Sequence, residues 1–334
     1  MINKKHQSSR QRYQLKRSRW KNKKRKRNGK NEINKSNLTH NGRVFVERVA
    51  PKIFNLKPEN VNEVITYINQ IKSIGKSGKW LNINLSNVEE IGIGAISMLI
   101  SVISELNEEG IIIKGTKPKN SDVNNELEQS GFMKFVNGLI QPSNLKTKNN
   151  IITGNKDTSH TEILNIIHSS MLTVWDEDGR SPLLYGTIVE MIKNSCKHAF
   201  KSDNNVKWHF AVSHDEIKNI AKFSFVDNGI GIVGSYRLGD FFNKARLVFK
   251  NNSDFIEGAF SQGIKSKTGL SWRGTGLPTI YESHDEEIIK NFVVITNDVY
   301  CNFDLDDKIE LQNEFRGTYY YWEIDKSCIK HCFK

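Results

Sequence analysis

Apolar and polar residues along positions 44–136 switch repeatedly between two periods. Alternation with period two predicts strands, and apolar positions three or four residues apart predict helices. The expected elements are strand 44–46, helix 60–74, strand 80–85, helix 96–106, strand 111–114 and helix 126–136. Strands that alternate with helices indicate a small α/β sandwich, which we place at residues 44–140.

The same kind of pattern resumes after residues 141–158, whose Pro, Asn, Lys and Thr content predicts a linker. The second set consists of helices 162–174 and 182–200, strands 207–213 and 220–226, a helix from about 276, and strands 292–296 and 318–324. Ser181 and Pro182 are residue types that favour the N-cap and the first turn of a helix. We therefore expect a second α/β domain at residues 159–326.

The net charge of +12 belongs to one end of the chain. Residues 1–30 contain fourteen Lys or Arg and no Asp or Glu, so the rest of the chain carries 12 − 14 = −2. With almost nothing to bury, residues 1–40 are expected to form a disordered basic arm. Such an arm, with Tyr13 and Trp20 available to stack on bases, could bind nucleic acid. An acidic protein, an acidic membrane surface or no partner at all are the alternatives.

Other bulk features favour a cytoplasmic protein. No stretch approaches the roughly 18 consecutive apolar residues of a membrane span. The N-terminus lacks the apolar segment of a secretory signal. The four cysteines are too scattered to predict a disulfide framework, which fits a reducing compartment.

The helix expected at 182–200 carries three polar residues in file. Glu190, Asn194 and His198 follow one another at intervals of four and line one edge of the apolar stripe, which includes Ser195. An amide oxygen suits magnesium, and a carboxylate one turn earlier can accept a proton from a water or a hydroxyl. A helix whose edge is merely polar is the alternative. The pattern thus indicates a pocket lining without proving one.

Two glycine-containing motifs follow this helix. Asp227, Gly229 and Gly231 come directly after strand 220–226, where a carboxylate can accept a hydrogen bond from an adenine amino group and glycines let the backbone turn. The second motif opens the helix near 276, where exposed backbone N–H groups bind phosphates. Its candidate nucleotide-binding residues are Arg273, Gly274, Thr275, Gly276 and Leu277. Taken singly, each motif is also a common turn or loop without a ligand.

In order, Glu-x-x-x-Asn on a helix, Asp-x-Gly-x-Gly after a strand and Gly-x-Gly-Leu before a helix resemble the GHKL superfamily of ATPases and kinases, over residues 155–325. The resemblance implies a two-layer α/β sandwich, with helices on one face of a mixed sheet, that binds ATP and Mg²⁺. It implies Glu190 as general base, Asn194 as magnesium ligand and Asp227 as adenine anchor. Gly229 and Gly231 would be hinges of an ATP lid at residues 232–272.

The activity implied by this resemblance has three versions. The first is an ATPase whose lid closure switches the binding of a protein or nucleic acid. The second is a protein serine/threonine kinase of the anti-sigma type, and the third is a nucleotide-sensing module without turnover. A sensor histidine kinase is not expected, because His160 lies only 30 residues before Glu190, too close for a phosphoacceptor helix pair.

The N-terminal domain resembles a STAS domain, the anti-sigma-antagonist fold. The resemblance rests on residues 81–88, on Ile91-Gly92-Ile93-Gly94-Ala95 before a helix, on residues 110–113 and on Gly131-Phe132. Signalling members carry a phosphorylatable Ser before the Gly-hydrophobic-Gly, where this chain has Ile91. We therefore expect a module that binds a protein partner or forms a homodimer.

Overall fold

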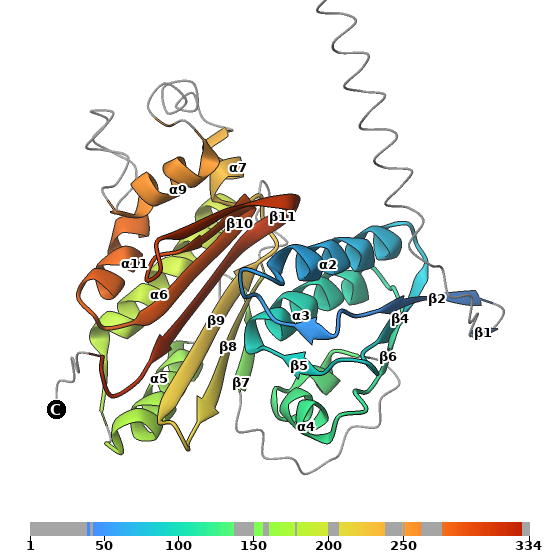
Figure 1. Cartoon of the computed structure of the whole chain (residues 1–334), viewed down its shortest axis with the longest axis horizontal. Coiled ribbons are helices and arrows are strands. Elements are labelled where there is room, and N and C mark those ends of the chain that lie inside the picture. Colours follow the sequence, from blue (N-terminus) through green and yellow to red (C-terminus); the bar gives the residue numbers. More distant parts are fainter. Residues whose placement is uncertain are drawn as a thin grey trace, which may run out of the picture. The chain divides into compact units, whose positions relative to one another are not determined.

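The structure is a computed structural model, and it describes residues 39–40, 43–136, 150–155, 160–177, 179–199, 207–237, 249, 251–261 and 276–328 (Figure 1). The predicted basic arm lies outside the described residues, except for Thr39 and His40. The chain forms two units, residues 1–47 and 48–334. In the first unit, β1 (Thr39–His40) pairs antiparallel with the start of β2 (Arg43–Val49).

Residues 48–136 form a mixed α/β arrangement, in which the predicted alternation of strands and helices is confirmed. The elements after β2 are β3 (Ile53–Phe54), α2 (Val61–Lys76), β4 (Trp80–Asn84), β5 (Glu90–Ile91), α3 (Ile93–Glu108), β6 (Ile113–Thr116), α4 (Ser121–Gln129) and the 3-10 turn η1 (Phe132–Lys134). β4 pairs parallel with β6, and β3 pairs parallel with β5. Parallel neighbours need a crossover connection, which α3 supplies between β4 and β6.

The last helix of this part differs from its prediction. It runs from Ser121 to Gln129 instead of 126–136. The side chain of Asn120 starts the helix early by accepting a hydrogen bond from the backbone N–H of Asp122 at 2.9 Å. Gly131, in the left-handed region with φ of 79°, ends it before the apolar residues that follow.

Residues 150–328 are built around a five-stranded sheet with the order β10-β11-β9-β8-β7. Its strands are β7 (Asn150–Gly154), β8 (Trp208–Asp215), β9 (Ile220–Asp227), β10 (Lys290–Asn302) and β11 (Asp307–Ile324) (Figure 1). Each neighbouring pair is antiparallel, so this sheet is not the mixed one that the resemblance implies. β7 lies inside the predicted linker, where Ile151 and Ile152 supply a short apolar run that pairs with β8.

One face of this sheet, called the first face below, packs against helices and forms the hydrophobic core of residues 150–328. Helices α5 (His160–Trp175), α6 (Pro182–Asn194), α7 (Ile232–Arg237), α9 (Asn252–Ser261) and α11 (Gly276–Asp285) contribute to it. Successive residues of a strand point to opposite faces, so every second residue of β8, β9 and β11 is available to these helices. Phe223 and Trp322 stack there with ring centroids 5.2 Å apart, and Phe210 stacks on both.

The second face of the sheet is covered as well. α3 lies on β8 and β9, and α2 lies along β11. Twelve of the sixteen residues of α3 are buried, because the helix also packs against α2. A helix that is buried on all sides is apolar on all sides, which explains its almost uninterrupted apolar sequence.

Helix α6 begins as its sequence predicts. Ser181 accepts a hydrogen bond from the backbone N–H of Leu184 at 3.4 Å, and Pro182 occupies the first turn. The α-helix ends at Asn194 and continues as a π-helical turn, η2 (Ser195–Ala199). Among the described helices, none is long and apolar enough to cross a membrane.

Candidate functional site

Asp227 lies at the end of β9, and its carboxylate accepts three hydrogen bonds. Its Oδ2 accepts from the Ser195 hydroxyl at 2.8 Å, and its Oδ1 accepts from the backbone N–H of Gly229 at 2.9 Å. In the sheet it pairs with Thr318 of β11, whose backbone N–H donates to the same carboxylate. Helix, loop and neighbouring strand therefore hold one carboxyl group in a single orientation.

The environment of Asp227 opposes its negative charge. The residue is 2% exposed, and burial raises the pKa of its carboxyl to about 6, although the bonds from Gly229, Ser195 and Thr318 lower that pKa. A carboxylate offers about four acceptor positions, of which the three donors use three. One acceptor position is thus left for a further N–H donor, such as a ligand amino group.

A second cluster brings the other two motifs together. Glu190 and Asn194 lie on consecutive turns of α6, and Gly276 begins α11, which packs on α6. A Cβ built on Gly276 would lie 2.5 Å from Glu190 Oε1 and 2.9 Å from Asn194 Oδ1. The backbone at the start of α11 therefore lies against both polar side chains, and any side chain at this position would make them shift.

This cluster contains a polar group without a partner. Asn194 Nδ2 is buried and makes no hydrogen bond within the described part of the chain. Buried amide groups are nearly always hydrogen-bonded, so this nitrogen is available to donate to a ligand or a water. Glu190 is 23% exposed, and its Oε2 lies 3.5 Å from Nζ of Lys193. The cluster thus combines a carboxylate, an amide and the N-terminal end of a helix.

The turn after β9 is fixed by β10. Gly231 has a φ of 76°, and a Cβ on it would lie 2.3 Å from Asn297 Oδ1. Asn297 Nδ2 donates to the Ile230 carbonyl at 2.9 Å, and Thr296 Oγ1 accepts from the backbone N–H of Ile232 at 2.8 Å. Gly231 is therefore required by both backbone geometry and close packing.

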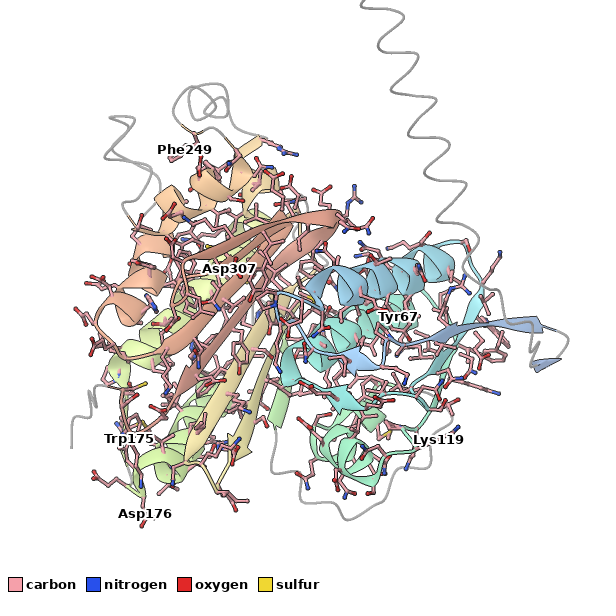
Figure 2. The ribbon with its side chains drawn as sticks, viewed as in Figure 1. Tyr67, Lys119, Trp175, Asp176, Phe249 and Asp307 are labelled. Atoms are coloured by element: carbon pink, nitrogen blue, oxygen red, sulfur yellow. The ribbon has the colours of Figure 1, made fainter. Side chains whose placement is uncertain are left out.

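The segment predicted to be an ATP lid is partly anchored. Within residues 232–272 the structure describes α7 and α9, and it places Ile232, Val233, Ile256 and Phe260 in the core. Phe249, labelled in Figure 2, packs edge-on against Phe255 with ring centroids 5.6 Å apart. A lid that moves as one piece from 232 to 272 does not fit this packing.

The remaining predicted residues divide into two groups. The side chain of His198 and all of Arg273, Gly274 and Thr275 lie outside the described residues. Leu277 is 8% exposed and its side chain belongs to the core, so only its backbone can face a ligand.

Sequence reasoning missed several residues of the site. The sequence pattern places Ser195 in the apolar stripe of its helix, and a hydroxyl in such a stripe is the one local signal of its role. Thr318, Thr296 and Asn297 reach the site through strand pairing, which no local pattern reveals. Tyr320 of β11 is also buried near the site. Burial raises the pKa of its hydroxyl well above the usual value, and the charges of Asp227 and Glu190 add to this.

The described residues contain no group of three or more His, Cys, Asp or Glu that could hold a metal by themselves. Magnesium, which takes oxygen ligands and keeps several waters, needs only one or two protein ligands when phosphates supply others. Asn194 Oδ1, with Glu190 beside it, suits that mode of binding. Comparison of the sequence with protein-family models and with curated proteins gives no match.

Proposed function

We propose that residues 150–328 bind Mg²⁺-ATP in the manner of the GHKL superfamily and hydrolyse it. The observation that carries the proposal is the convergence of Glu190, Asn194 and Gly276, with a buried amide nitrogen left unpaired. Glu190 and Gly276 are 276 − 190 = 86 positions apart in the sequence, and this spacing alone does not require them to meet. Their meeting supports one common ligand.

The two clusters suit the two ends of a nucleotide. Asp227 keeps one acceptor position for the adenine amino group, and its buried setting disfavours bases that lack a donor there. Helix α11 begins beside Asn194 and Glu190, and the backbone N–H groups at the start of a helix suit phosphate oxygens. When bound, magnesium would neutralise phosphate charge, with Asn194 as its protein ligand.

Glu190 is the proposed general base. In hydrolysis, the oxygen of a water forms a bond to the γ-phosphorus while the bond from that phosphorus to the bridging oxygen breaks, giving ADP and phosphate. Glu190 accepts the proton that the water gives up. The side chain is partly exposed, so water can reach it.

The N-terminal part is included in the proposal as a STAS-like regulatory module. Its support is the alternation of strands and helices, with parallel pairing between β4 and β6. We propose that nucleotide binding changes what this part binds, and that the basic arm contributes a site for nucleic acid or an acidic protein.

The decisive experiment is calorimetry of Mg²⁺-ATP binding to the full chain and to Asp227→Asn. Wild type is expected to bind and the variant to lose binding, because an amide in that place cannot offer the same two acceptor oxygens. Asp215→Asn is the matched control, since Asp215 lies at the opposite end of the β8–β9 pair. A folded wild type that binds no ATP would overturn the proposal.

Phosphate release then distinguishes turnover from binding alone. Free phosphate produced by the purified chain supports hydrolysis. Phosphate that appears on a protein partner would instead favour the kinase version, and neither would favour a nucleotide-sensing module.

A further inference from the structure

One face of α3 meets the second face of the five-stranded sheet through three small residues. Gly94, Ser97 and Ser101 follow one another at intervals of three and four, so they lie on the same side of the helix. They contact Tyr319, Ser224 and Asn228 in turn, ending beside the strand end that carries Asp227.

The first two contacts fix α3 at close range. A Cβ on Gly94 would lie against the Tyr319 hydroxyl, so the helix can approach only because it has no side chain there. Ser97 Oγ donates to the Ile93 carbonyl at 2.9 Å, which leaves Ser224 to donate to Ser97 Oγ at 2.7 Å. Both serines are fully buried, so loss of either hydroxyl leaves the other without this partner.

The third contact joins α3 to the candidate adenine site. Asn228 Nδ2 donates to the backbone carbonyl of Ser101 at 2.9 Å, and the Ser101 hydroxyl lies 3.1 Å from Asn228 Oδ1. Asn228 sits between Asp227 and Gly229, and the N–H of Gly229 donates to the carboxylate of Asp227. The amide of Asn228 and the carboxylate of Asp227 are thus carried by one short piece of backbone.

This arrangement differs from ordinary packing between two layers. An apolar contact is indifferent to small sliding movements, whereas hydrogen bonds depend on distance and angle. A displacement of α3 along its axis would break the contacts of Asn228. The backbone that carries Asp227 would then keep only its anchors on η2, β10 and β11 and would be held less tightly.

We propose that Asn228 and Ser101 are positioning residues through which α3 of the N-terminal part sets the affinity of the nucleotide site. The proposal rests on the proposed function, because it assumes that Asp227 binds adenine. By thermodynamic linkage, nucleotide binding must then stabilise the observed position of α3 by the same free energy by which α3 in that position stabilises nucleotide binding.

The test compares Asn228→Ala with Ser97→Ala in the full chain. Asn228→Ala is expected to weaken Mg²⁺-ATP binding by about 5- to 150-fold, the usual range of coupling between two sites. We expect the wild type to bind Mg²⁺-GTP more weakly than Mg²⁺-ATP. Asn228→Ala should leave that GTP binding unchanged, because the substitution misplaces only the carboxylate that selects the base. Ser97→Ala removes an equally buried bond of the same interface away from the turn, and should lower thermal stability while ATP affinity stays within about twofold.

Hydrogen exchange on the wild type gives a second readout that needs no variant. Addition of Mg²⁺ and a non-hydrolysable ATP analogue should slow amide exchange in residues 93–108 as well as in residues 227–231.

The outcomes separate the two proposals. If the wild type binds ATP but Asn228→Ala binds it equally well, or loses ATP and GTP binding alike, the positioning role is overturned and the nucleotide site stands. Unchanged exchange in α3 on binding, or an equal loss of affinity in Ser97→Ala, would also overturn it. A folded wild type that binds no nucleotide overturns both.

Discussion

Asp227→Asn should stabilise the folded chain near neutral pH, although it removes a group from the candidate site. Burial raises the pKa of this carboxyl from its ordinary 3.8 to about 6, against the lowering effect of its three hydrogen bonds. The folded state therefore holds the proton more tightly than the unfolded state does. The resulting stabilisation is complete below about pH 4 and is lost as the pH rises through about 6.

The size of the effect follows from the difference between the two pKa values. About two pH units correspond to about 3 kcal/mol of unfolding free energy. An asparagine has nearly the same shape and no charge to desolvate. Its Oδ1 has two acceptor positions for the N–H groups of Gly229 and Thr318, and the Ser195 hydroxyl can turn to accept from its Nδ2. The unfolding free energy of the wild type should thus fall as the pH rises, whereas that of the variant should not fall for this reason.

Urea unfolding of both proteins between pH 4 and pH 8 measures the effect, with the fluorescence of the buried Trp208 and Trp322 as signal. The unfolding free energy of the variant minus that of the wild type should rise with pH, by up to about 3 kcal/mol. Asp215→Asn, at the other end of the same strand pair, serves as control. A difference that is constant with pH, or that falls as pH rises, would refute the argument from burial.

Four further changes test other parts of the structure. Glu190→Ala should keep ATP affinity within a few-fold in calorimetry and abolish phosphate release; equal loss of both contradicts the general-base role. Gly276→Ala places a methyl group 2.5 Å from Glu190 Oε1, so the Glu190 and Asn194 side chains must shift, and it should weaken ATP binding, measured as a smaller thermal shift with ATP. Gly231→Ala should lower the unfolding free energy measured in urea by more than the roughly 1–2 kcal/mol expected of Gly78→Ala. Both glycines have a positive φ, but of the two only Gly231 is crowded by a neighbouring side chain, that of Asn297. Deletion of residues 1–30 should flatten the salt dependence of binding to a polyanion and leave ATP affinity unchanged. Polyanion binding that is unchanged by the deletion would show that the basic arm is not the binding site.

The parts of the fold that follow from local pattern could be predicted from the sequence. Helix α6 begins at Ser181 and Pro182 as expected, because capping depends on adjacent residues. Strand β9 ends at Asp227 within one residue of its predicted boundary, because apolar periodicity stops there. The mixed α/β character follows from the alternation of the two periods.

The parts that depend on distant residues could not be predicted. Nothing local shows that Thr318 pairs with Asp227, or that Asn297 holds the turn at Gly231, since both contacts come from the register of β10 and β11. β7 could not be predicted from the sequence because a short edge strand in a polar segment has too few residues to show a hydrophobic period. Helix α3 begins at Ile93 rather than at the predicted residue 96, a start that the sequence does not indicate because Ile93 and Gly94 are not typical of a helix N-terminus.

The double-sided burial of α3 also determines which fragments of this protein can be prepared. Residues 150–328 expressed alone would expose the sheet face that holds Ser224 and Tyr319 to solvent, together with the edge of β11 that binds α2 through Gln312 and Asn62. Residues 48–136 alone would expose the apolar side of α3. Each half alone would thus expose one face that is buried in the full chain, so we expect a soluble fragment of this chain to keep both.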